Sequence, residues 1–590
     1  MAIVARGMLI TEAYRDYKNG KFIINRKYQR KLVWTIEEKQ KLIDSIVRGY
    51  PIPLILLAHT KDDKYEVIDG MQRLDAIFTF IDNKYSVGEG FYFDTNEFQT
   101  SKIYNKEAMP EGVKYISQQD CANITEYQLA VTIFPIEDEN SVTDIFGRIN
   151  SGGRQLSNQE KRQAGVDNPL SNFVRKVSSK MRMDITDDII ELSLMPSISI
   201  DGIKKSDKQG YGINAEDTFW VHQGILTSKD LRDSVDEQII ADITASILLK
   251  SPFASSKEKL DELYDINTNL SEEVTSALLA YPEARLEEEI NTTVSTIVDV
   301  ISQYSREKYT FKNLVIPDGR ANSSRTPFYA VFMAFFRLIV AEGKKPINMV
   351  GICKTLTGIN ERLQKGKHHV TPEDRTTNIN LTYGLLSDNF TVSTPSLVGH
   401  GQGLIIDFEA ALSRSKIESA RYEMKQGVLN LIGTPELNKK LLNKINEIIC
   451  SMANIGPSSS GGNIFIGIAD NLNDSNKIES IYNVTPCIFS GKYIFGVEKE
   501  CEKLGIDLDA YMRILVDNIR GSELSSEVKA DVLSNIDHIT YHGKTVVWIK
   551  VPPQRVMAWI GEKSYHREDS NTVPVTPKLS TIIDKRFDIR

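Results

Sequence analysis

The stretch YEVIDGMQRLDAIFTF, residues 65–80, begins with the pattern of a strand and ends with the pattern of a helix. The residues YEVI at 65–68 suit a strand, whereas the apolar residues of LDAIFTFI at 74–81 recur at helical spacing. The residues DGMQR at 69–73 therefore lie at a strand-to-helix corner. A carboxylate, an amide and a guanidinium meet at this corner, which makes it a candidate site.

The corner carries side chains that suit a phosphate ligand. The first backbone N–H groups of a helix have no partner within the helix and carry partial positive charge, so they attract anions. Gly70 would let the backbone approach the ligand, and Arg73 can form two hydrogen bonds with a phosphate. Gln72 can position a water or a ribose hydroxyl, and Asp69 can hold Mg²⁺ or accept a proton. An alternative is that Asp69 only caps the helix while Arg73 lies on its solvated face.

Two further polar stretches extend this prediction. Residues 21–34, KFIINRKYQRKLVW, contain five basic residues and no acid, and aromatic residues are interleaved with them. The basic residues are Lys21, Arg26, Lys27, Arg30 and Lys31. Residues 146–160, FGRINSGGRQLSNQE, place Arg148 and Asn150 beside a glycine pair. Either stretch alone is typical of a solvated basic loop, but together with the corner they supply three loops that can converge on one phosphate ligand.

Four blocks in this order resemble a prokaryotic protein family. The blocks are YQRKLVW, LIDSIVRGYPIPLILL, VIDGMQRLDAI and FGRINSGGRQLSNQEKR, and the family is the one whose signature is DGQQR. It includes the GmrS-type half of the GmrSD modification-dependent restriction enzymes, and the resemblance extends over roughly residues 8–385. It implies a ParB/sulfiredoxin-like fold and a role in phage defence through binding or hydrolysis of a nucleoside triphosphate, GTP or ATP, with Mg²⁺ or Mn²⁺.

The same resemblance assigns residues. It places the catalytic residues at Asp69, Gln72 and Arg73, with Asp69 also as a metal ligand and Gly70 as a nucleotide contact. Further nucleotide contacts are Tyr28, Gln29, Arg30, Arg148 and Asn150. Met71 departs from the family pattern, because it replaces the usual first glutamine and a thioether cannot donate or accept as an amide does. We therefore expect nucleotide hydrolysis to be weakened while nucleotide binding persists.

Sequence patterns divide the chain into four parts. Residues 1–165 alternate β-like runs such as PLILLA and LAVTIF with helical patterns, which predicts an α/β domain. Residues 166–387 carry apolar residues at spacings of three and four, which predicts a helical region. Residues 388–403 combine Pro, Gly, Ser and Thr without periodicity and are typical of a linker. In residues 404–590 the β-like runs NIFIGIA, KYIFGV and KTVVWIKV predict a second α/β domain.

The second α/β domain contains a possible metal-dependent site. In KIESARYEMKQGVLN, residues 416–430, Glu423 and Lys425 share one face of a strand, and Glu418 reaches the same place only if the chain bends. A carboxylate that binds Mg²⁺ or Mn²⁺ beside an ammonium is suited to phosphodiester cleavage. The alternative is a surface strand on which the glutamate and the lysine form a salt bridge.

Further blocks resemble the Schlafen AlbA-like domain. These are the residues ES, E-M-K, a helix ending in A-N, GGNIFIGIAD and the late turn SYHRED, over about residues 410–575. The resemblance implies a carboxylate trio of Glu418, Glu423 and Asp470 that binds metal and cleaves. Lys425, also part of the catalytic set, and Arg567 would contact the phosphates of the nucleic acid. Many bacterial relatives are assigned only nucleic-acid binding. We therefore expect this domain to bind DNA or RNA, and cleavage is the weaker part of the inference.

Composition narrows the classes of function. The net charge of −8 argues against a surface coated with basic residues, so a nucleic acid must bind at a local patch. The five cysteines are scattered singly, which argues against a zinc knuckle or a disulfide framework. The amino terminus lacks the apolar core of a signal peptide, and the most apolar run, 328–341, is too short to cross a bilayer and contains Arg337. We therefore expect a cytoplasmic protein without membrane partners.

The sequence supports three hypotheses about the function. In the first, a nucleotide at the 69–73 corner gates a carboxy-terminal domain that binds and cuts DNA or RNA. In the second, the protein is a nucleic-acid-binding sensor or regulator that works with a separate nuclease, which would agree with the lack of a His-Asn-His nuclease pattern. In the third, the helical region mainly mediates assembly, either as a homo-oligomer or with an operon-encoded partner.

Overall fold

The computed structural model divides the chain into two compact units, Met1–Val398 and Gly399–Arg590. The division lies within the range 388–403 that the sequence predicts as a linker. The structure describes residues 3–26, 31–104, 112–135, 157–163, 168–184, 189–195, 198–199, 213–254, 256–319, 324–364, 370–393, 404–415, 419–430, 436–457 and 461–587. Among these residues, no helix is both long enough and apolar enough to cross a membrane.

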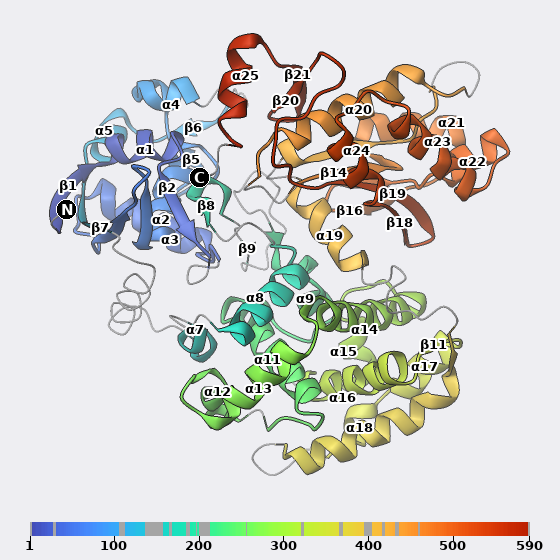
Figure 1. The fold of residues 1–590 in the computed structure, drawn as a ribbon. Coiled ribbons are helices and arrows are strands. Elements are labelled where there is room, and N and C mark those ends of the chain that lie inside the picture. The colour runs from blue at the N-terminus through green and yellow to red at the C-terminus, as the bar shows by residue number, and fades with distance from the viewer. Residues whose placement is uncertain are drawn as a thin grey trace. The chain divides into compact units, whose positions relative to one another are not determined.

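The first unit begins with a sheet surrounded by helices (Figure 1). Its strand order in the described residues is β1-β7-β3-β4-β2-β8. The strands are β1 (Val4–Leu9), β2 (Phe22–Asn25), β3 (Ile55–His59), β4 (Tyr65–Asp69), β7 (Gln128–Pro135) and β8 (Ile189–Glu191). The strands expected at 53–58, 65–68 and 129–134 correspond to β3, β4 and β7. Strand β8 lies beyond residue 165, so the sheet takes an edge strand from the part of the chain expected to be helical.

One hydrophobic core holds this sheet to its helices. The helices are α1 (Ile10–Lys18), α2 (Ile36–Val47), α3 (Met71–Ile81) and α5 (Gln118–Thr125). Leu74, Ile77 and Phe78 of α3 are buried in this core together with Val67 of β4. The apolar spacing of residues 74–81 therefore fixes which side of α3 faces the sheet. The rotation of the helix about its axis is then fixed as well, and it determines on which side the residues of the first turn lie.

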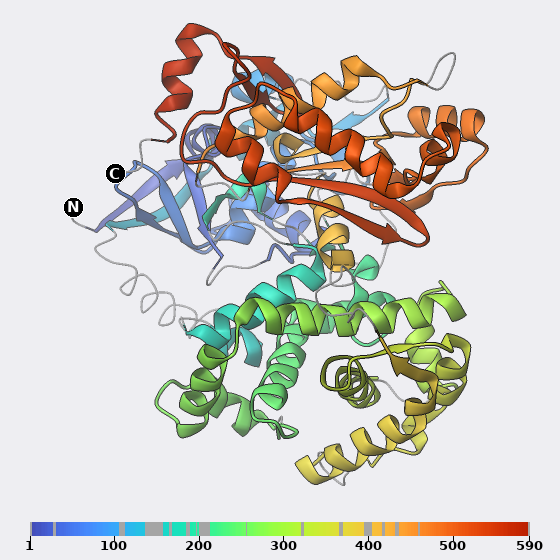
Figure 2. The same ribbon diagram turned by 45° about the vertical axis from the view of Figure 1, so that its right-hand side comes forward.

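The remainder of the first unit is mainly helical and forms the green and yellow part of Figure 2. Its principal helices are α8 (Pro169–Arg182), α10 (Ser228–Arg232), α11 (Val235–Leu248), α12 (Lys257–Tyr264), α14 (Glu283–Tyr304), α16 (Arg325–Phe336) and α18 (Pro372–Leu386). The apolar run 328–341 forms most of α16 and a π-helical turn, Arg337–Ala341, and its large side chains are mostly buried. This confirms the buried helix predicted from the sequence. At the end of the unit, β12 (Phe390–Val392) pairs with β11 (Lys344–Pro346).

The second unit is built on a sheet of order β13-β14-β19-β18. Its strands are β13 (Tyr422–Lys425), β14 (Gly462–Ile466), β19 (Lys544–Val551) and β18 (Ile536–Tyr541), and the β18–β19 hairpin is visible in Figure 2. Strand β13 is an edge strand that runs parallel to β14, with Glu423 opposite Ile464. A smaller sheet joins β15 (Ile468–Ala469), β17 (Lys492–Ile494) and β16 (Cys487–Phe489), and β20 (Tyr565–Glu568) pairs with β21 (Asn571–Pro574).

The main sheet of the second unit has an apolar core on each face. On one face, Ile445 and Ile449 of α20 (Lys439–Ala453) are buried with Ile464 of β14. On the other face, Phe408 of α19 (Leu404–Arg414) packs against Phe465, with ring centroids 5.4 Å apart. Because neighbouring residues of a strand point to opposite faces, β14 contributes to both cores. The mixed α/β class predicted for this part of the chain agrees with the structure.

Candidate functional site

Gly70 makes the turn between β4 and α3. Its φ of 103° and ψ of 6° lie in the left-handed region, and it occupies the N-cap position of α3. A Cβ at this position would come within 2.5 Å of Cδ1 of Ile55. Both the backbone conformation and the neighbouring side chain therefore require glycine here.

Asp69 and Arg73 form an ion pair across this turn. Nη2 of Arg73 lies 2.8 Å from Oδ2 of Asp69 and also donates to the backbone oxygen of Leu54 at 3.1 Å. The Arg73 side chain is 14% exposed and the Asp69 side chain 39% exposed, so the carboxylate is the more accessible partner. Within the described residues, Nε of Arg73 is buried and has no hydrogen-bond partner. A buried guanidinium N–H without an acceptor is costly, which favours an acceptor brought by a ligand or by a segment outside the described residues.

The first turn of α3 is not capped by a side chain in the described structure. This differs from α2 and α5 of the same layer, where Thr35 and Ser117 accept hydrogen bonds from the first turn. The alternative in which Asp69 caps α3 and Arg73 lies on a solvated face does not match this geometry. Instead, the entrance of α3 presents backbone N–H groups beside an acid and a largely buried arginine.

Gln72 holds a neighbouring segment of chain. Its Oε1 accepts from the backbone N–H groups of Val33 at 3.1 Å and Trp34 at 3.2 Å, and its Nε2 donates to the backbone oxygen of Lys31 at 2.8 Å. The carboxamide therefore fixes residues 31–34 against the start of α3. These three contacts join positions 38 to 41 residues apart. The sequence does not predict them; it predicts that Gln72 positions a water or a ribose hydroxyl.

Met71 faces the protein interior. Its side chain is 7% exposed and belongs to the core formed by the sheet and its helices. The departure from the DGQQR pattern therefore changes the packing beneath the corner, because Met71 is part of the core whereas the Asp69 side chain is 39% exposed. A thioether suits this place, since an amide would lack water as a hydrogen-bond partner.

Two basic residues of the stretch 21–34 are structural. Arg26 donates from Nη1 to the backbone oxygen of Asp184 at 2.6 Å and from Nη2 to its carboxylate at 3.2 Å. Nζ of Lys31 donates to the backbone oxygen of Leu231 at 2.8 Å and to Oγ of Ser234 at 2.9 Å, and burial lowers the pKa of Lys31. The expectation of a solvated basic loop is therefore wrong at these two positions. Both side chains are buried, and their hydrogen bonds connect the sheet layer to the helical part of the first unit.

The other expected nucleotide contacts cannot be placed. Tyr28, Gln29, Arg30, Arg148 and Asn150 lie outside the described residues. The described part of the candidate nucleotide site therefore consists of Asp69, Gly70, Gln72 and Arg73.

In the second unit, Glu423 forms two ion pairs at the edge of the sheet. Nζ of Lys425 lies 2.6 Å from one carboxylate oxygen, and Nη1 of Arg567 lies 3.0 Å from the other. Arg567 is only 2% exposed and also donates to the backbone oxygen of Ala420 at 3.0 Å and to Oγ1 of Thr572 at 3.0 Å. The salt bridge that the sequence left open as an alternative is thus present, and Arg567 is built into the same cluster.

Asn454 positions the strand that carries Arg567. It ends α20, and its Nδ2 donates to the backbone oxygens of Ala558 at 3.1 Å and Tyr565 at 2.9 Å and to Oγ of Ser564 at 3.0 Å. Its Oδ1 accepts from the backbone N–H of Ala558 at 2.7 Å. The helix-ending A-N pair noted in the sequence therefore fixes the entry into β20, and through β20 it places Arg567 against Glu423.

The expected metal-binding trio is not assembled by the described residues. Asp470 is paired with Lys492, and its side chain is 59% exposed, while Glu418 lies outside the described part of the chain. Within the described residues, no group of three or more His, Cys, Asp or Glu side chains is placed so that it could share a metal ion. Glu423 and Asp470 alone do not form the oxygen cage that Mg²⁺ or Mn²⁺ prefers.

One comparison with known proteins gives a match. Residues 10–166 match the GmrSD restriction endonuclease, N-terminal domain. This GmrSD-like part includes the whole 69–73 corner together with strands β2, β3, β4 and β7. Neither the curated proteins nor the solved structures include a match to this chain.

Sequence reasoning missed a buried charged cluster next to β13 in the second unit. Glu500 is 1% exposed, accepts from the backbone N–H groups of Val428 at 2.7 Å and Leu429 at 3.1 Å, and accepts from the Tyr511 hydroxyl at 2.7 Å. Lys499 donates to the backbone oxygen of Gln426 at 2.7 Å, and burial lowers its pKa to about 8. The run EKE at 498–500 is typical of a solvated helix face, so the sequence held no clear sign of this role.

Proposed function

We propose that this protein is a restriction-type phage-defence protein whose GmrSD-like part binds a nucleoside triphosphate at the 69–73 corner. One observation carries the proposal: the Asp69–Arg73 pair lies at a helix entrance without a side-chain cap, within the residues that match a restriction endonuclease domain. The helix start and Arg73 supply positive charge for a phosphate group. Asp69 supplies an accessible carboxylate beside them.

The residues at the corner fit a nucleotide accompanied by a divalent cation. Mg²⁺ is commonly held by one or two carboxylates together with substrate phosphates, and it neutralises the phosphate charge. Asp69 would provide the carboxylate, and its pair with Arg73 would open as Arg73 turns its N–H groups to the phosphate. Gln72 would act indirectly, by holding residues 31–34 beside the ligand.

Phosphate release by the purified full-length chain tests this proposal. GTP and ATP would be offered with Mg²⁺, and binding of the same nucleotides would be measured by calorimetry. Asp69→Ala should abolish phosphate release, and Arg73→Ala should weaken nucleotide binding by at least about tenfold, since about 1.4 kcal/mol corresponds to one decade. Asp62→Ala, an exposed acid in the loop between β3 and β4, is the matched control and should behave as the wild type. Unchanged binding and turnover in both corner variants would overturn the assignment.

For the second unit we propose nucleic-acid binding, on the strength of its resemblance to the Schlafen AlbA-like domain. A regulator that binds without cutting is the second candidate function. It is favoured by the two ion pairs of Glu423, which occupy both oxygens of the carboxylate expected to lead cleavage.

A binding and cleavage assay separates these candidates. Labelled single- and double-stranded DNA and RNA would be incubated with the full-length chain in Mg²⁺ or Mn²⁺. If the chain cuts a nucleic acid and Glu423→Ala abolishes this cutting, the result supports a nuclease. If the chain retains a nucleic acid but cuts none of them with either metal, the result supports the regulator. If none of these nucleic acids is retained, nucleic-acid binding by this unit is refuted.

A further inference from the structure

A network of buried charged side chains joins the sheet layer of the first unit to its helical part. Its members are three cations and three carboxylates, namely Arg26, Lys31, Arg182, Asp184, Asp236 and Glu237. The first two lie between β2 and α2, in the sheet layer. The other four lie at the end of α8 and in the first turn of α11, in the helical part. We call this set the buried charge network.

Arg182 is the centre of the buried charge network. Its Nη1 lies 2.5 Å from Asp236 and 3.1 Å from Glu237, and its Nε lies 3.3 Å from Asp184. Arg26 donates to the backbone oxygen of Asp184 at 2.6 Å and to its carboxylate at 3.2 Å. The chain that follows β2 is thus connected, through Asp184 and Arg182, to the start of α11. Strand β2 pairs with β4, the strand that leads into the corner.

Lys31 connects the same start of α11 to the corner. Its Nζ donates to the backbone oxygen of Leu231 at 2.8 Å and to Oγ of Ser234 at 2.9 Å, which lie at the turn between α10 and α11. Burial lowers the pKa of Lys31, Arg182 adds to this effect, and the carboxylates of α11 oppose it, so the ammonium lies within the field of the network. The backbone oxygen of Lys31 accepts from Nε2 of Gln72 at 2.8 Å. One residue therefore bonds both to the α10–α11 turn and to the first turn of α3.

The segment 31–38 is held from both sides. On one side, Gln72 bonds to its backbone at three points. On the other side, Nη2 of Arg232, at the end of α10, lies 2.9 Å from the carboxylate of Glu38 in α2. Gln72 is followed by Arg73, the cation of the corner, and both belong to the first turn of α3. A displacement of this segment therefore acts directly on the turn that carries Arg73.

The cost of burying six charges argues for a role in geometry. Removal of a charge from water is unfavourable, and the attraction between buried charges offsets this only when the geometry is good. Apolar side chains of similar volume often stabilise such a contact equally well. Ion pairs and hydrogen bonds, in contrast, hold only within a narrow range of distance and angle. A network of this kind therefore determines where the neighbouring segments of chain lie.

We propose that the buried charge network positions residues 31–34 against Gln72 and thereby sets the affinity of the corner for its nucleotide. The network residues act through this segment and do not contact the nucleotide. The inference rests on the proposed function, because it concerns the same nucleotide site. It adds that the site depends on the end of α8 and the start of α11, which lie beyond the matched residues 10–166.

The direction of the effect separates positioning from electrostatic attraction. Lys31→Met removes a cation of the network, and Asp184→Asn removes a carboxylate. If the network acted only through its charge, the loss of a carboxylate would strengthen the binding of a phosphate group. Positioning predicts instead that both variants weaken the binding of GTP or ATP, each by at least about fivefold, as is typical of coupled sites. Calorimetry of the full-length chain with Mg²⁺ measures the affinities.

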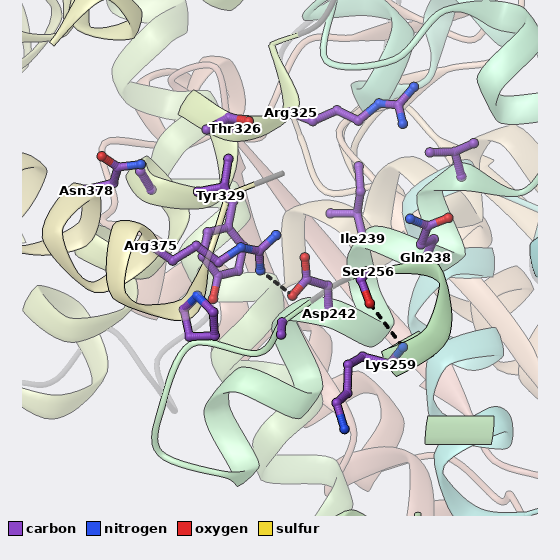
Figure 3. Close-up of a pocket in the computed structure, with 15 residues that line it drawn as sticks. Gln238, Ile239, Asp242, Ser256, Lys259, Arg325, Thr326, Tyr329, Arg375 and Asn378 are labelled. Carbon is purple, nitrogen blue, oxygen red and sulfur yellow. Dashed lines mark hydrogen bonds and ion pairs between the residues drawn. The ribbon is translucent and has the colours of Figure 1, made fainter. Parts of the chain in front are cut away.

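Arg375→Met is the matched control. Arg375 forms a nearly buried ion pair with Asp242, which lies further along α11, and the two groups are 2.7 Å apart in the wall of a cavity of about 430 Å³ (Figure 3). Loss of this pair should lower the free energy of unfolding and leave the nucleotide affinity unchanged. Ser234→Ala is a milder variant for the case in which a network variant does not fold. It removes one acceptor of Lys31 and no charge, and it should also weaken nucleotide binding.

All variants are compared with the wild type at a temperature at which circular dichroism shows each protein to be folded. A purely structural role would change the free energy of unfolding but leave the affinity of the folded protein as it is. Weaker binding by the network variants and unchanged binding by the control support the positioning role. If a folded network variant binds as tightly as the wild type or more tightly, or if the control is weakened equally, the positioning role is overturned while the corner assignment stands. If the wild type binds neither GTP nor ATP, the corner assignment itself fails, and the positioning role fails with it.

Discussion

Nη1 of Arg567 lies 3.0 Å from Oε2 of Glu423, although the two residues are 144 positions apart in the chain. This contact joins the late β20–β21 hairpin to the edge strand β13. Arg567 is nearly buried, and Lys425 holds the second oxygen of the same carboxylate. The pair therefore fixes the edge strand β13 against the β20–β21 hairpin of the second unit.

Arg567→Ala should lower the free energy of unfolding of the second unit by about 2–3 kcal/mol. Loss of one partner of a buried ion pair typically costs about 3–5 kcal/mol, and Glu423 would keep Lys425 as a partner. Urea denaturation of the full-length chain measures the change. Arg555→Ala, an exposed arginine of the same unit, is the control and should differ from the wild type by less than about 0.5 kcal/mol. Equal effects of the two variants would contradict a structural role for Arg567.

Gly70→Ala should destabilise the first unit more than Gly90→Ala does. Both glycines have positive φ, 103° and 95°, so an alanine at either position costs about 1 kcal/mol of backbone strain. At Gly70 the new Cβ also meets Ile55, whereas nothing lies within 4 Å at Gly90. The clash should add about 1–3 kcal/mol. The two melting temperatures measure the difference, and the prediction fails if they fall by the same amount.

Gln72→Ala should release residues 31–34 from the start of α3. Three hydrogen bonds would be lost, and the backbone groups of Lys31, Val33 and Trp34 would lose their side-chain partner. Hydrogen exchange should accelerate at the amides of Val33 and Trp34 while the amides of β7 keep their protection. Gln72→Glu should protect these two amides better than Gln72→Ala, because a carboxylate still accepts from both N–H groups although it cannot donate to Lys31. Exchange at 33–34 that is unaffected by Gln72→Ala would rule out this role.

The stability of the second unit should depend on pH through Lys499. Burial lowers the pKa of Lys499 to about 8 from 10.5, so the charged form is disfavoured in the folded state. The cost is fully present below pH 8 and is relieved as the pH rises towards 10.5, where the unfolded chain also loses the proton. The contribution to the free energy of unfolding should therefore increase by up to about 1.4 kcal/mol per pH unit in this window.

Lys499→Met isolates this contribution. The difference in unfolding free energy between wild type and variant should change across the window, since other titrating groups cancel in the comparison. Lys503→Met on the same helix, α22 (Glu498–Leu504), removes an exposed lysine and should show no such change with pH. If the free energies of unfolding of the wild type and of Lys499→Met change with pH in the same way, the lowered pKa of Lys499 is refuted.

The sequence by itself determined the local structure. The pattern of apolar residues predicted the positions of β3, β4, β7, α20 and β19. An element that is buried on one face repeats its apolar residues with the period of a strand or a helix, and this period is visible within a short stretch of sequence. The change of period at residues 69–73 located the corner of the candidate nucleotide site. The boundary of the first α/β domain was less well predicted. Strand β8 lies beyond residue 165 and belongs to the sheet only because it pairs with β2, a distant segment of the chain.

Only the tertiary structure decided which polar side chains face the solvent and which are buried and hydrogen-bonded within the protein. Arg26 and Lys31 resemble phosphate-binding residues in the sequence, yet their partners lie 158 and 200 residues away. Arg567 meets Glu423 through a contact of similar range, 144 positions along the chain. The physical reason is that a period reports only whether a residue is buried, whereas the partner of a buried charge depends on how distant segments pack together.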